Sequence, residues 1–191
     1  MNEQHLWTLI LRMPRLEGER VILRKLTPRD AGDVYEYSSN PEITKYLSWS
    51  EHESVAYTKK YLKYVTKRYK SGEFLDWGIE EKETGKLIGT CGYTSVNIDN
   101  LAAEIGYVIN PKYQKMGYGR ECVRLILDYS FGDLELNRLS ARVNPSNLPS
   151  IRLLEELSFV CEGRGKKEAL IKGEFWDILH YALCREDYYS V

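Results

Sequence analysis

The stretch that decides the fold is Pro111-Lys112-Tyr113-Gln114-Lys115-Met116-Gly117-Tyr118-Gly119-Arg120-Glu121. A strand-like run over residues 103–109 precedes it, and a helix-like run over residues 121–129 follows it. The first N–H groups of a helix lack intrahelical partners and lie at the positive end of the helix dipole. Glycines let phosphate oxygens approach such a backbone closely. The segment therefore predicts a turn that binds a pyrophosphate.

The composition fits one domain and argues against several classes of protein. A chain of 191 residues that is 43% hydrophobic can bury one sizeable core. Its 27 Lys and Arg residues nearly balance its 28 Asp and Glu residues, so no nucleic-acid partner is expected. The four cysteines and three histidines are scattered, which predicts neither disulfides nor a metal site. No apolar run is long enough to cross a membrane. We expect a cytoplasmic protein, a monomer or homodimer, that contacts no membrane.

The hydrophobic pattern predicts a mixed α/β sheet. Thr27-Pro28-Arg29-Asp30 predicts a helix start after a first strand, and Ser50 offers a second start for a helix that runs to about Lys70. Residues 1–15 are expected to be an extension that packs on the domain or mediates association. The remaining strands are predicted at residues 75–80, 86–93, 103–109, 137–143, 158–163 and 176–183, with a helix over residues 147–157.

With these motifs, the chain resembles the GNAT superfamily of acetyl-CoA-dependent N-acetyltransferases. Gln114-Lys115-Met116-Gly117-Tyr118-Gly119 fits the acyl-CoA signature Gln/Arg-x-x-Gly-x-Gly/Ala, and Glu104-Ile105-Gly106-Tyr107 precedes it at the expected distance. Asn147-x-x-Ser150-x-x-Leu153 with Phe159-x-x-Glu162-Gly163 is similar to the RimJ/RimL branch, which includes ribosomal-protein N-acetyltransferases. The similarity begins at about residue 16, so residues 16–191 are expected to form the acetyltransferase domain.

The resemblance implies the GNAT fold, a mostly antiparallel central sheet that splays between its fourth and fifth strands and carries flanking helices. It implies acetyl-CoA as co-substrate and no metal. The pyrophosphate would bind the amides of Gln114, Lys115, Met116, Gly117, Tyr118 and Gly119. The Val108 N–H would polarise the thioester carbonyl, and the Asn110 backbone would bind the pantetheine arm. Asn147 would contact CoA as well as cap its helix.

The resemblance leaves the proton transfers open. Leu154 stands where many members have a tyrosine that protonates the departing thiolate, so Ser150 becomes the expected donor. Ser150 is otherwise a first-turn serine that bonds to the backbone. Glu104 is one candidate base, or else a structural carboxylate. Glu168, in a predicted loop over residues 164–169, is a second candidate base, or else a solvated charge.

We therefore expect an N-acetyltransferase that moves an acetyl group to a primary amine by direct attack in a ternary complex. A peptide or protein N-terminus is the favoured acceptor, and small amines remain open. The alternative is a non-catalytic acyl-CoA-binding sensor or interaction module, which only the missing tyrosine at Leu154 supports.

Overall fold

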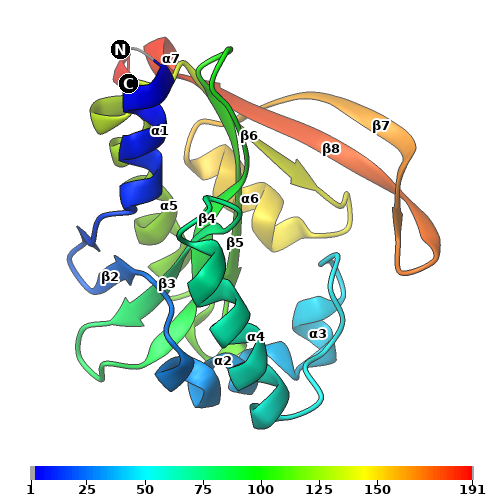
Figure 1. The fold of residues 1–191 in the computed structure, drawn as a ribbon. Helices are drawn as coiled ribbons and strands as arrows, with labels where there is room; N and C mark the ends of the chain where they lie inside the picture. The colour runs from blue at the N-terminus through cyan, green and yellow to red at the C-terminus, as the bar shows by residue number, and fades with distance from the viewer. Residues whose placement is uncertain (1–2, 191) are drawn as a thin grey trace.

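A computed structural model describes residues 3–190 of the chain and contains one eight-stranded sheet in the order β1-β2-β3-β4-β5-β6-β8-β7 (Figure 1). All neighbouring strands are antiparallel except β5 and β6, which confirms the mixed, mostly antiparallel sheet. The strands are β1 (Leu16–Glu17), β2 (Val21–Arg24), β3 (Leu75–Glu81), β4 (Leu87–Asn97), β5 (Ala102–Ile109), β6 (Arg138–Val143), β7 (Val160–Ile171) and β8 (Glu174–Cys184).

Helices cover both faces of the sheet (Figure 1). They are α1 (Glu3–Arg12), α2 (Ala31–Ser38), α3 (Pro41–Thr44), α4 (Val55–Arg68), α5 (Tyr118–Asp128), α6 (Leu148–Glu156) and α7 (Arg185–Tyr189). Helices α2 and α4 pack together on one face, whereas α5 packs on β2, β4 and β5 from the other. Among the described residues, no helix has both the length and the apolar character needed to cross a bilayer.

The N-terminal segment forms helix α1 and joins the core. Leu6 and Ile10 on α1 are buried. The Tyr129 hydroxyl donates to the Leu9 carbonyl at 2.9 Å, and the Trp77 indole N–H donates to the Pro14 carbonyl at 2.8 Å. Residues 1 and 2 of the expected extension lie outside the described residues.

Several predicted boundaries differ from the structure, most clearly those of α4 and β7. Helix α4 begins at Val55, because Ser54 and not Ser50 is its N-cap and accepts from the Tyr57 N–H at 3.1 Å. The predicted loop over residues 164–169 is instead part of β7, with a register irregularity between Gly165 and Ala169. Nearly every β7 side chain is exposed, so this strand lacks the apolar alternation by which strands are recognised.

Strands β7 and β8 form a long hairpin that extends away from the body of the protein (Figure 1). Its turn reaches back toward α3, where the Lys172 Nζ donates to the Thr44 carbonyl at 2.9 Å. The hairpin therefore borders the α2–α4 face of the sheet as well as extending its edge.

The parallel pairing of β5 with β6 ends early. It runs from Ala102 opposite Arg138 to Glu104 opposite Ser140, although β5 continues to Ile109 and β6 to Val143. Beyond Glu104 the two strands are not paired, so a gap opens between their C-terminal halves. The sequence predicts one strand where the structure has β1 and β2, so β5 and β6 are the fourth and fifth predicted strands. This gap is therefore the predicted splay between them.

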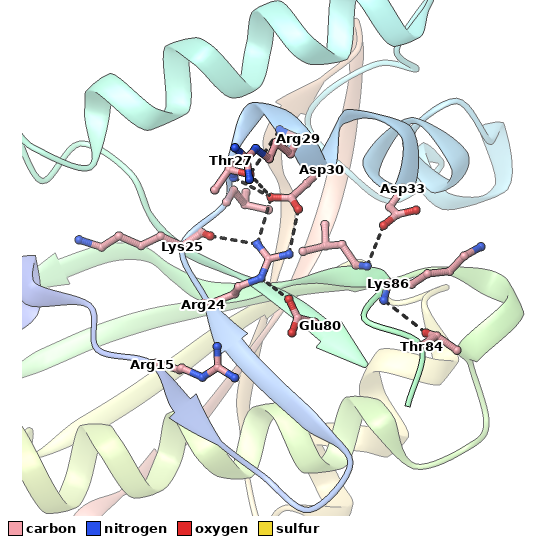
Figure 2. A network of polar contacts seen from close by, with 12 residues as sticks. Arg15, Arg24, Lys25, Thr27, Arg29, Asp30, Asp33, Glu80, Thr84 and Lys86 are labelled. Atoms are coloured by element: carbon pink, nitrogen blue, oxygen red, sulfur yellow. Dashed lines mark hydrogen bonds and ion pairs between the residues drawn. The ribbon is translucent and has the colours of Figure 1, made fainter. Parts of the chain in front are cut away.

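A buried ion cluster fixes the junction between β2 and α2 (Figure 2). The Arg24 guanidinium donates two hydrogen bonds to the Asp30 carboxylate, at 2.8 and 3.0 Å, and pairs with Glu80 on β3. Asp30 also accepts from the Thr27 N–H at 2.6 Å and completes a capping box, which confirms the predicted N-cap at Thr27. The cluster ties the chain that enters α2 to the centre of the sheet.

We expect Asp30→Ala to lower the free energy of unfolding by about 2–4 kcal/mol, because it leaves Arg24 largely buried with Glu80 alone. Burial raises the pKa of Asp30, but the bonds from Arg24 and Thr27 outweigh it and the net pKa is lowered. The contribution of Asp30 is therefore present above about pH 4 and is lost as the pH falls through the folded pKa. Chemical denaturation of wild type and variant from neutral to acid pH measures both effects.

The matched control is Glu17→Ala, which breaks the exposed pair between Arg15 and Glu17. Exposed pairs contribute about 0–1 kcal/mol, so this variant should unfold almost as wild type does. Equal losses in the two variants would contradict the structural role of the cluster.

Candidate active site

The turn between β5 and α5 presents a row of backbone N–H groups. Gly117 is the N-cap of α5 with φ 85°, and Lys115 has φ 61°. The first helical hydrogen bond runs from the Glu121 N–H to the Gly117 carbonyl at 3.1 Å. The N–H groups of Tyr118, Gly119 and Arg120 precede that bond and have no intrahelical acceptor. This arrangement, at the exposed start of an eleven-residue helix, suits phosphate oxygens.

Arg20, in the turn between β1 and β2, braces this turn. Its guanidinium donates to the Met116 carbonyl at 2.8 Å and to the Glu121 carboxylate at 3.0 Å, and it lies 4.6 Å from the centre of the Tyr118 ring. The Gln114 side-chain amide donates to the Ile109 carbonyl at 2.9 Å and ties the turn to the end of β5. These contacts hold the N–H row in place before any ligand binds.

The β5 edge that lines the gap carries the N–H groups of Tyr107 and Ile109. The Asn110 N–H donates to the Ile88 carbonyl of β4 at 2.8 Å, so the backbone of Asn110 faces β4. The carbonyls of Leu101 and Ile109 face the other way, because they accept from the Asn137 N–H and the Gln114 side chain. Strand backbones alternate, and the register from Gly106 to Ile109 is unbroken. The odd-numbered residues of β5 therefore face the gap.

This register contradicts two predicted roles. The Val108 backbone faces β4, where its carbonyl would lie 2.1 Å from a Cβ placed on Gly89, so its N–H cannot polarise a thioester in the gap. The Asn110 N–H is already bonded to Ile88, and its carbonyl accepts from the Tyr113 N–H at 2.8 Å. The groups available for these tasks lie one residue earlier, on Tyr107 and Ile109.

Beneath the gap, Ser150 meets a tyrosine that the sequence did not single out. Ser150 lies in the first turn of α6, whose N-cap Asn147 accepts from the Ser150 N–H at 3.4 Å. The Tyr107 hydroxyl lies 2.8 Å from the Ser150 Oγ. Burial raises the pKa of Tyr107, although the bond to Ser150 opposes it, so the tyrosine stays protonated at neutral pH. Leu154 is fully buried in the core.

The two candidate bases lie apart from this hydroxyl pair. Glu104 accepts from the Thr94 hydroxyl at 2.7 Å, and its side chain leaves the face of β5 opposite to Tyr107. Glu168, on β7, is bound by Arg142 at 2.9 Å and by the His180 Nε2 at 2.6 Å. The hydrogen bond from His180, with the charge of Arg142, lowers the pKa of Glu168.

The predicted residues thus surround one gap from two sides. The Gln114–Gly119 turn closes one end of it, and Asn147 and Ser150 lie at its α6 side. Glu104 is the last residue of β5 that pairs with β6. Its side chain lies on the face of the sheet opposite to Tyr107, and we call this face the acceptor face. Within residues 3–190, no three His, Cys, Asp or Glu residues are arranged to hold a metal ion.

Comparison with known proteins identifies the family and the fold. Residues 20–160 match the family model described as an acetyltransferase (GNAT) domain. The chain is 35% identical to the uncharacterized N-acetyltransferase p20 of Bacillus licheniformis, over 92% of this chain and 99% of that protein. It is 27% identical to the [ribosomal protein uS5]-alanine N-acetyltransferase of Escherichia coli, over 91% and 92% of the two chains. A crystal structure of spermidine N-acetyltransferase from Vibrio cholerae with CoA and spermine superposes with TM-score 0.76 and 25% identity, over 89% and 98%.

We expect Gly117→Val to weaken CoA binding at least tenfold, because a β-branched residue is strained at φ 85° and its Cβ lies 3.1 Å from the Arg20 guanidinium. Titration calorimetry with CoA measures the loss. Gly173→Val is the matched control, because Gly173 has φ 82° in the β7–β8 turn with open space around it. The control shares the backbone strain and should keep its CoA affinity. An unchanged affinity in Gly117→Val would refute the phosphate-binding role.

Proposed function

The chain belongs to the GNAT acetyltransferase family, and from that membership we propose a route and an acceptor for its reaction. It is an acetyl-CoA-dependent N-acetyltransferase. Membership of this family favours an enzyme over a non-catalytic acyl-CoA-binding sensor or interaction module. We propose direct attack of the acceptor amine on the thioester in a ternary complex. The acceptor amine and the thioester meet in the gap between β5 and β6.

One observation carries this proposal. The gap has unpaired strand N–H groups along one edge and an N–H row from a helix start at its end. A CoA molecule needs both, because its pyrophosphate requires several donors and its pantetheine amides require a strand-like partner. When both substrates bind here, they lose their translational and rotational entropy on binding, so this entropy is not lost in the chemical step.

The Tyr107 N–H is the proposed donor to the thioester oxygen, and the Ile109 N–H is the proposed partner of the pantetheine arm. As the amine attacks, negative charge grows on the carbonyl oxygen, and a fixed N–H lowers that barrier without reorganising. Donors of this kind contribute roughly 3 kcal/mol.

Ser150 is the proposed proton donor to the departing sulfur. The Tyr107 hydroxyl donates to the Ser150 carbonyl at 3.3 Å and lies 2.8 Å from the Ser150 Oγ. We propose that during the reaction it donates to the Oγ instead, which leaves the serine hydrogen directed at the sulfur. This support compensates for Leu154, which has no proton to give.

Of the two predicted bases, Glu104 suits the task better than Glu168. Glu168 is held between His180 and Arg142, and its lowered pKa disfavours taking a proton near neutral pH. Within residues 3–190, the Glu104 carboxylate has only the Thr94 hydroxyl as a hydrogen-bond partner, at 2.7 Å.

A peptide or protein N-terminus is the proposed acceptor. The relative that acts on an alanine of ribosomal protein uS5 supports it, whereas the spermidine enzyme supports a small polyamine. The test measures free thiol release from acetyl-CoA with peptides bearing a free or a blocked α-amine, and with spermidine. We expect turnover with free peptides and intersecting initial-velocity plots. Parallel plots would contradict direct attack, and turnover with spermidine alone would contradict the acceptor.

We expect Ser150→Ala and Tyr107→Phe each to lower kcat, the second by about tenfold, without weakening CoA binding. Because Tyr107 acts through Ser150, the double variant should be no slower than Ser150→Ala alone. Tyr93→Phe is the matched control, since it removes a second buried tyrosine–serine bond, 2.6 Å to Ser130. That variant should lose stability but keep kcat. Additive losses at positions 107 and 150 would contradict the coupling.

A further inference from the structure

Asp76 lies on the acceptor face, where neither sequence motif nor resemblance assigned a role. On β3 it pairs with Gly92 of β4, and Gly92 pairs with Gly106 of β5. Paired residues share a face of the sheet, so Asp76, Gly92 and Gly106 form a row across three strands. Gly106 is the neighbour of Tyr107, whose N–H faces the gap. The row therefore leads from a carboxylate to the place where the thioester would bind.

The two glycines leave the space over this row open to the carboxylate. A Cβ on Gly92 would lie 2.3 Å from the Leu75 carbonyl and 2.8 Å from the Asp76 Oδ1, so this glycine lets β3 and its carboxylate approach β4 closely. On Gly106, an added Cβ would meet only the Thr94 methyl, at 2.8 Å. Neighbouring strands are about 4.8 Å apart, so the carboxylate lies roughly one to two strand spacings from Gly106. An amine held over Gly106 is then within reach, directly or through one water.

The surroundings of Asp76 are crowded but carry no opposite charge. Three tyrosines face it, namely Tyr37 of α2, Tyr61 of α4 and Tyr69, the C-cap of α4. Cys91 of β4 is near in space but lies on the opposite face of the sheet, paired with Trp77. Burial raises the pKa of each, so all four are neutral at pH 7. The Tyr69 hydroxyl donates to the backbone carbonyl of Asp76 at 2.8 Å and leaves the carboxylate untouched.

Lys25, which packs on Tyr69, is bonded to another group. Lys25 lies over the Tyr69 ring, with its Nζ 5.5 Å from the ring centre, and donates to the Leu11 carbonyl at 3.4 Å. Within residues 3–190, burial alone acts on the Asp76 carboxyl, and it raises the pKa to about 7. The side chain nevertheless keeps partial solvent exposure. A carboxylate of this kind favours either a proton or an incoming cation.

We propose that Asp76 binds the ammonium group of the acceptor on the acceptor face and receives its proton before attack. This inference rests on the proposed acetyl transfer and replaces Glu104 as the proton acceptor. The ammonium proton moves to Asp76, which becomes a neutral carboxylic acid. The free amine nitrogen then forms the C–N bond, the C–S bond breaks with its electron pair on sulfur, and the proton lost by that nitrogen balances the one gained by sulfur. Asp76 afterwards returns its proton to solvent.

The same site discriminates between classes of amine. An N-terminal α-amine has an ordinary pKa of about 7.7–8.0, whereas an alkylammonium such as lysine has about 10.4. Transfer to a group near 7 is then uphill by about one unit for the α-amine and by more than three for the alkylammonium. Asp76 thus favours a peptide N-terminus over a polyamine or a lysine side chain.

The test is Asp76→Asn, which keeps the shape and removes the proton acceptor. We expect kcat/KM for a free-amine peptide to fall about 100-fold near neutral pH, with CoA affinity unchanged. When kcat/KM of this variant is measured from about pH 6 to about pH 9, the rise near pH 7 should be absent. Only the titration of the amine should then shape the profile. Glu80→Gln is the matched control, because Glu80 lies four residues after Asp76 on the same face of β3. This variant should keep both the value of kcat/KM and its rise near pH 7.

Three outcomes separate the possibilities. If wild type acetylates no peptide amine, the proposed acceptor fails together with this inference. If wild type is active and Asp76→Asn keeps its rate and its rise near pH 7, only the inference fails. If Glu104→Gln removes that rise and Asp76→Asn does not, Glu104 is the base and the inference is overturned.

A measurement on wild type covers the case in which Asp76→Asn does not fold. Carbon-13 NMR of labelled aspartate should show one carboxyl that titrates near neutral pH and shifts when the peptide is added. The absence of such a carboxyl would overturn the inference.

Discussion

The early end of the pairing between β5 and β6 is the constraint on which the site depends. Parallel strands that stayed in register to Ile109 and Val143 would use every backbone donor on both edges. Because pairing stops at Glu104 and Ser140, the N–H groups of Tyr107 and Ile109 have no strand partner. The α5 turn then closes the end of the opening. An unpaired edge is usually a liability, and here it serves as the surface that a ligand completes.

The gap also divides the chemistry between the two faces of the sheet. The hydroxyls of Tyr107 and Ser150 lie on the α6 side, whereas Glu104 and Asp76 leave the sheet on the acceptor face. The proposed donor for sulfur and the proposed acceptor for the amine proton are thus kept apart by the strands themselves. The separation matters, because a carboxylate and a hydroxyl in contact would bond to each other instead of to substrate.

Local patterns predicted most of the fold but not the orientation of single peptide groups. The turn at Gln114–Gly119 and the capping box at Thr27 follow from short motifs, whereas the splay was expected from the family resemblance. The backbones of Val108 and Asn110 face β4 and not the gap, which the sequence did not predict, because side-chain alternation fixes the faces of a strand but not which edge each N–H meets. Asp76 was missed because its surroundings come from Gly92 and Gly106, on other strands. The far half of β7 was missed because solvent surrounds both of its faces.

Asp76 weakens the protein that contains it. Its pKa lies near 7 in the folded chain and near 3.9 in an unfolded one, so folding opposes ionisation between these values. The stability that the protonated Asp76 carboxyl contributes is fully present below about pH 4 and is progressively lost as the pH rises toward 7. Selection for heat resistance alone would therefore favour chains that have replaced this aspartate. In the proposed role of Asp76, selection for turnover would retain it, so the two kinds of selection would lead this sequence in opposite directions.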